Sequence, residues 1–165
     1  MANITLGGTP THTTGDLPAI GQQAPNVTLT KTDLSACDIQ DFRGQNVILN
    51  IFPSIGTGVC AQSVRTFNKE AASLENTLVL CISRDLPFAQ EGFCGAEGIE
   101  NVHMLSDYKT GEFGKVYGVT IMDGAFEALL SRAVVVLDTQ GKVTYTEQVP
   151  EIGQEPNYKA ALAAI

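Results

Sequence analysis

Two apolar runs with a helical pattern between them constrain the fold of this chain more than any other feature. The first run, VILNIF at 47–52, is stopped by Pro53, and the second, TLVLCIS at 77–83, is as apolar as a buried strand. Between them, apolar residues recur at helical spacing at Val64, Phe67, Ala71 and Leu74. We therefore predict a β-α-β unit over 47–83, with parallel strands and a right-handed crossover.

Shorter patterns extend this unit on both sides. Strands are predicted at 27–30, 102–105, 133–137 and 143–149, the last two joined by a turn. Short helices are predicted from Pro87, at 113–117 and from Pro156, and a small hairpin within 1–16. This order is typical of an α/β thioredoxin-like fold, in which helices flank a central mixed sheet. The length suits one domain of ~100–200 residues, so we expect a single domain over 1–165 with an N-terminal hairpin extension.

Charge and targeting signals exclude several classes of protein. The chain has 10 Lys and Arg against 18 Asp and Glu, and its net charge of -8 repels phosphate backbones and anionic membranes. Its first residues lack the basic and apolar regions of a secretory signal, and no apolar run approaches the ~20 residues of a membrane span. We therefore expect a soluble, cytoplasmic protein with no nucleic-acid or membrane partner, whose thiols stay reduced unless they act in catalysis or sensing.

Four cysteines, at 37, 60, 81 and 94, are the main candidates for chemistry. No two of them form the close pairs that zinc sites and CxxC redox motifs require, so we expect no metal and no cofactor. Cys81 lies inside an apolar strand and is predicted to be a core residue. Cys37 lies beside acidic residues, whose charges disfavour a thiolate, and no role is assigned to it.

Cys60 differs from the others because it ends the segment PSIGTGVC, where a buried strand has stopped and a helix begins. If Thr57 is the N-cap, Cys60 is the third helical residue, and helix N-termini favour the thiolate form of cysteine. A fast nucleophile also needs fixed donors for the charge that develops during reaction. The candidates are the Thr57 hydroxyl, the N–H groups of 58–60 and Arg132, for which a surface charge at a strand end is an equally good interpretation.

Cys94 lies in a glycine-rich stretch after the short helix that begins at Pro87. We predict that glycines 92, 95 and 98 break the chain there and make it mobile. If Cys60 is oxidised to a sulfenic acid, a second thiol within reach closes a disulfide before irreversible over-oxidation. Simple packing of Cys94, or a static disulfide with Cys60, fits the spacing as well.

Rival cysteine chemistries have little support. A Cys/His hydrolase needs an imidazole beside the thiol, and neither His12 nor His103 has a supporting context. The interval from Cys60 to Arg65 is one residue too short for a phosphatase-type loop, and no GxxxxGK[ST] motif is present.

Three segments carry a resemblance to a known family. Pro53, Thr57 and Cys60 match the pattern Pro-x-x-x-Thr-x-x-Cys, and with it the chain resembles the peroxiredoxins. DLPFAQEGFCGAEG at 85–98 and SRAVVVLD at 131–138 are similar to segments of the bacterial thiol peroxidase branch. The likeness runs from about Leu17 to the C-terminus.

This resemblance implies a thioredoxin-like fold and an atypical two-cysteine mechanism of peroxide reduction. Cys60 would be the peroxidatic cysteine and Cys94 the resolving cysteine of the same subunit. Thr57 and Arg132 would orient the peroxide and stabilise the transition state, and Pro53 would shield the sulfur from water. The resemblance also implies thioredoxin as reductant and a homodimer.

The sequence therefore predicts a thiol peroxidase that reduces hydrogen peroxide and organic hydroperoxides through a Cys60 sulfenic acid and a Cys60–Cys94 disulfide. The alternative is a non-catalytic redox sensor or binding module that uses the same disulfide. For the two cysteines to meet, the start of the Cys60 helix and the segment 87–98 both have to loosen. Gly56 departs from the family, since many relatives carry aspartate there, and Cys37 is not associated with it.

Overall fold

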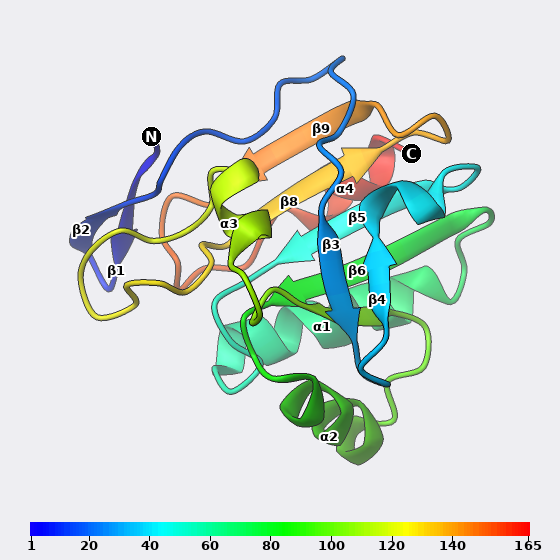
Figure 1. The fold of residues 1–165 in the computed structure, drawn as a ribbon, viewed down its shortest axis with the longest axis horizontal. Coiled ribbons are helices and arrows are strands. Elements are labelled where there is room, and N and C mark those ends of the chain that lie inside the picture. Colours follow the sequence, from blue (N-terminus) through cyan, green and yellow to red (C-terminus); the bar gives the residue numbers. More distant parts are fainter.

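A seven-stranded mixed sheet forms the centre of the computed structural model, which describes residues 1–165 (Figure 1). Its strand order is β4-β3-β7-β6-β5-β8-β9. The strands are β3 (Thr28–Lys31), β4 (Ala36–Asp38), β5 (Asn46–Ile51), β6 (Thr77–Ser83), β7 (His103–Ser106), β8 (Ala133–Leu137) and β9 (Val143–Gln148). The helices are α1 (Gly58–Ala71), α2 (Pro87–Glu97), α3 (Glu112–Val116) and α4 (Tyr158–Ala163), with a 3₁₀ turn at Ile39–Phe42.

The predicted β-α-β unit is confirmed as β5-α1-β6. β5 and β6 pair in parallel from Asn46 opposite Thr77 to Ile51 opposite Ile82. β8 pairs antiparallel with β5 on its other side, and Ala133 lies opposite Ile51. The ends of β5 and β6 and the start of β8 therefore meet at one edge of the sheet.

Alternate residues of β5 enter two different cores. Leu49 and Ile51 pack in the core on one face, with Phe113 and Tyr117 from the α3 region. Ile48 packs in the core on the other face with side chains of α1 and α4, and α2 packs against its margin. In Figure 1, α3 lies in front of the sheet and α1 and α4 behind it, as in the predicted thioredoxin-like α/β fold.

α2 differs from its prediction. The expected breaks at Gly92 and Gly95 are wrong, because the helix runs through both and ends at Gly98, which adopts the left-handed conformation with φ 65°. Phe93 and Cys94 pack against the core beside α1, and this tertiary burial outweighs the low helix propensity of glycine. Cys94 consequently lies within a helix rather than in an irregular segment.

The remaining differences are small. The last helix begins at Tyr158 rather than Pro156, because Asn157 is the N-cap and its side chain accepts a hydrogen bond from the Ala160 N–H. The predicted hairpin is present as β1 (Asn3–Leu6) and β2 (Thr9–His12). α1 is the longest helix, with 14 residues, and none of the helices has the length and apolar character needed to cross a membrane.

Candidate active site

Cys60 lies at the sheet edge where β5 and β6 end. Phe52 and Pro53 follow β5 as buried residues, a short loop reaches Thr57, and α1 begins at Gly58. Thr57 is the N-cap residue in extended conformation, so Cys60 is the third residue of the helix, as predicted. The Cys60 side chain is completely buried, with 0% of its surface exposed.

Arg132 lies directly before β8, and the pairing of β8 with β5 brings it next to Cys60. Its Nη2 donates to Cys60 Sγ at 3.1 Å, and its Nε donates to the Ile152 carbonyl at 2.7 Å. The side chain is only 2% exposed, so it is not a surface charge at a strand end. Nη1 is buried and has no hydrogen-bond partner within the protein.

The Thr57 hydroxyl donates to the Ser54 carbonyl at 3.1 Å and makes no capping hydrogen bond. No hydrogen bond joins it to the sulfur of Cys60, although the two residues lie in the same turn of chain. Its oxygen lone pairs remain available as acceptors. Pro53 is buried between the end of β5 and this loop.

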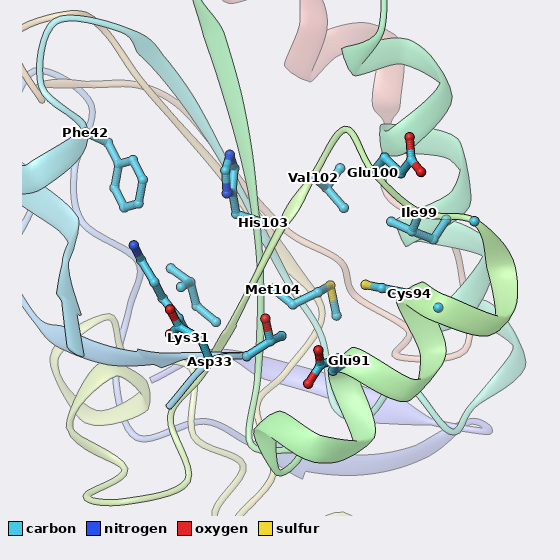
Figure 2. Close-up of a pocket in the computed structure, with 14 residues that line it drawn as sticks. Lys31, Asp33, Phe42, Glu91, Cys94, Ile99, Glu100, Val102, His103 and Met104 are labelled. Carbon is cyan, nitrogen blue, oxygen red and sulfur yellow. The ribbon is translucent and has the colours of Figure 1, made fainter. Parts of the chain in front are cut away.

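Cys94 is half-buried on α2, and its thiol is free. Figure 2 shows its sulfur pointing from α2 toward Met104 of β7, at the wall of a cavity of about 560 Å³. Burial raises the pKa of the Cys94 thiol, and the charge of Glu91 raises it further, so the thiol is protonated at neutral pH. All four cysteines are free.

Cys81 and Cys37 are both buried, on opposite faces of the sheet. Complete burial raises the pKa of Cys81 to about 12, and the prediction that it is a core residue is confirmed. Burial is also the main cause that raises the pKa of Cys37, with Asp41 and Asp38 adding to it and Lys31 opposing it. Neither sulfur is a nucleophile at neutral pH in this fold.

Neither histidine makes a hydrogen bond to a thiol. His12 Nδ1 is 2.7 Å from Asp123 Oδ2 near the N-terminal hairpin, and His103 lines the cavity beside Cys94 without a hydrogen bond to it. A Cys–His catalytic pair is therefore absent. No group of three His, Cys, Asp or Glu side chains is placed to hold a metal ion.

Two polar networks around Cys60 were missed by sequence reasoning. In the first, the Ser63 hydroxyl donates to the Cys60 carbonyl at 2.8 Å, and Asn50 Nδ2 donates to Ser63 Oγ at 3.2 Å. In the second, the Asp85 carboxylate binds the loop that precedes Cys60, through Ser54. The available signals were an asparagine inside an apolar strand and polar residues two or three positions after two neighbouring strands.

The Redoxin family matches residues 19–162 of the chain. Thiol peroxidase of Mycobacterium tuberculosis (strain ATCC 25618 / H37Rv) is 58% identical over 165 residues, which cover 100% of this chain and 99% of that protein. Thiol peroxidase of Corynebacterium glutamicum is 50% identical over the same shares of both chains. A peroxiredoxin-like protein from Aquifex aeolicus superposes with a TM-score of 0.93 at 34% identity, covering 99% of this chain and 96% of that one. These similarities confirm the resemblance drawn from the sequence motifs, and the chain belongs to the Redoxin family.

Proposed function

We propose that this chain, a peroxiredoxin-type peroxidase, reduces hydrogen peroxide and organic hydroperoxides with Cys60 as the peroxidatic cysteine. One contact carries the assignment of the site: Arg132 Nη2 lies 3.1 Å from Cys60 Sγ. The full-length similarity to thiol peroxidases also supports an oxidoreductase of this kind. We propose that residues 1–165 act as one domain.

In the first step, the Cys60 thiolate attacks one oxygen of the hydroperoxide and the O–O bond breaks. Its electron pair goes to the second oxygen, which takes a proton and leaves as water or alcohol, while Cys60 becomes a sulfenic acid. Arg132 Nη1, which has no partner in the protein, is free to donate to the oxygen on which negative charge develops. Thr57 is proposed to orient the peroxide by accepting its proton in a hydrogen bond, and Pro53 to exclude water.

In the second step, the Cys94 sulfur attacks the Cys60 sulfenic sulfur, an S–S bond forms and water leaves. Partial burial, with the charge of Glu91, keeps the Cys94 thiol protonated, and its sulfur points toward Met104, so it must leave this position for the attack. A dithiol reductant then restores both thiols and is itself oxidised to a disulfide. We propose thioredoxin as this reductant, a homodimer as the assembly and the cytoplasm as the location.

Replacement of Cys94 by serine is expected to leave the first step intact and prevent the second. The variant should consume one equivalent of peroxide per chain and stop at a Cys60 sulfenic acid, because a hydroxyl cannot form the disulfide. Trapping with dimedone and mass spectrometry measures the product, and NADPH oxidation coupled through thioredoxin reductase and thioredoxin measures turnover. Sustained turnover by Cys94→Ser at the wild-type rate contradicts the assignment of Cys94. In the same coupled assay, a non-catalytic sensor would form its disulfide without sustained peroxide consumption by wild type.

Replacement of Cys81 by alanine is expected to leave turnover unchanged. The sulfur is fully buried and protonated, so its loss leaves a small cavity and lowers the free energy of unfolding by about 1 kcal/mol. Urea unfolding measures the stability and the coupled assay the turnover. Cys37→Ser serves as a companion variant outside the site, and loss of turnover in either folded variant contradicts these assignments.

A further inference from the structure

One carboxylate lies between the two segments that carry Cys60 and Cys94. Asp85 follows the end of β6 and precedes α2, in the chain between both sites. Its Oδ1 accepts from Ser54 Oγ at 2.7 Å, and its Oδ2 accepts from the Ile55 N–H at 2.7 Å. Ser83 Oγ donates to Oδ2 as well, at 2.6 Å. Three donors from two different segments thus converge on one side chain.

On the Cys60 side, this carboxylate fixes the whole loop through Ser54. Ser54 Oγ accepts from the Gly56 N–H at 3.1 Å, and the Ser54 carbonyl accepts from both the N–H and the hydroxyl of Thr57. Gly56 has no side chain of its own with which to hold this loop. The position of the N-cap Thr57, and hence of the first turn of α1, therefore depends on Asp85.

On the Cys94 side, the network continues into α2. Ser83 Oγ, which donates to Asp85, accepts from Gln90 Nε2 at 3.2 Å, and Gln90 Nε2 also donates to the Leu105 carbonyl at 3.0 Å. Gln90 is fully buried and lies four residues before Cys94, on the same face of α2. A displacement of Gln90 therefore displaces Cys94.

Disulfide formation needs both of these segments to move. The Cα atoms of a disulfide lie ~4.4–6.8 Å apart. In the present arrangement the Cys60 sulfur, on α1, accepts a hydrogen bond from Arg132, and the Cys94 sulfur, on α2, points toward Met104. The hydrogen bonds that hold the loop and those that hold α2 meet at Asp85 and its partner Ser83. Release at this point frees both segments together.

We propose that Asp85 is a positioning residue that fastens the Cys60 loop to the Cys94 helix, favouring peroxide reduction and opposing disulfide closure until it is released. This inference rests on the proposed pairing of Cys60 with Cys94. Asp85 touches neither sulfur and acts through Ser54 and Ser83.

Asp85→Ala removes all three acceptor contacts, and Asp123→Ala is a matched control. Asp123 also accepts from three donors, Thr11 Oγ1, the His12 N–H and His12 Nδ1, but it joins β2 to the loop after Met122. In the reduced protein, amide hydrogen exchange in 54–60 and in 87–97 is expected to rise about tenfold in Asp85→Ala and to stay unchanged in Asp123→Ala. An increase in one segment alone, or in neither, overturns the proposal.

The two chemical steps are expected to respond in opposite directions. In Asp85→Ala the rate of Cys60 oxidation by peroxide should fall about tenfold, while disulfide closure from the sulfenic acid becomes several-fold faster, so less sulfinic acid accumulates at high peroxide. Rapid quenching with mass spectrometry measures both rates. If both steps slow, or if neither changes, the proposal is overturned and Asp85 has a structural role only.

If Asp85→Ala does not fold, two further variants test the same proposal. Ser54→Ala removes one of the three donors and should shift exchange and both rates in the same directions by smaller factors. Asp85→Asn keeps one acceptor oxygen and should restore part of the wild-type behaviour. The exchange measurement uses reduced protein without peroxide, so its outcome does not depend on the proposed function. Failure of the proposed function would appear in a different experiment, as normal turnover by Cys94→Ser.

Discussion

Cys60→Ser is expected to abolish peroxide reduction, lowering the rate at least about 10³-fold to the background of the coupled assay. A serine hydroxyl remains un-ionised at neutral pH and does not attack the O–O bond, while its size suits the space that the buried thiol occupies. Thioredoxin-coupled NADPH oxidation and direct peroxide consumption measure the loss.

The fold of this variant should be preserved, because Ser Oγ can accept the hydrogen bond that Arg132 donates to Cys60 Sγ. An unchanged circular-dichroism spectrum and thermal midpoint serve as the control. A folded Cys60→Ser protein that consumes peroxide as fast as wild type would refute the assignment of the peroxidatic cysteine.

Arg132→Met is expected to slow Cys60 oxidation about 10²–10³-fold, the loss typical when a fixed donor to a developing negative charge is removed. Arg132 lies beside the sulfur with one guanidinium nitrogen unpaired and makes no ion pair with a carboxylate. Competition between the variant and a reference peroxidase for limiting peroxide measures the rate constant. Arg132→Lys keeps the charge, but one ammonium does not reproduce the planar fork that reaches both Ile152 and Cys60, so a smaller loss is expected.

The stability of Arg132→Met separates a catalytic role from a structural one. A buried cation without a carboxylate partner is costly to desolvate, so methionine is expected to leave the free energy of unfolding equal or higher while activity falls. Alkylation of Cys60 by iodoacetamide should slow less than its oxidation by peroxide, because only the peroxide reaction develops charge on an oxygen. A variant that is strongly destabilised, or in which both reactions slow equally, contradicts this role for Arg132.

Local patterns in the sequence predicted most of the elements. The run at 77–83 coincides with β6, because a continuous apolar run indicates a strand buried on both faces. The helix begins at Gly58, as predicted from the end of the strand run at Pro53 and an N-cap at Thr57. β4 and the 3₁₀ turn at Ile39–Phe42 were not predicted, since three or four residues carry too little periodicity. The path of α2 through two glycines was also missed, because packing against the core stabilises it.

The amino-acid sequence by itself determined where the chemistry resides: a cysteine at the start of a helix after a buried strand, with a second cysteine and an arginine as candidates. Only the tertiary structure decided that Arg132, 72 residues from Cys60, is buried against its sulfur, through the pairing of β5 with β8. It also decided that Cys94 is held in a helix and that Asp85 connects the two cysteine-bearing segments. Periodicity reports the surroundings of neighbouring residues, whereas these contacts depend on strand order and long-range packing, which no local pattern encodes.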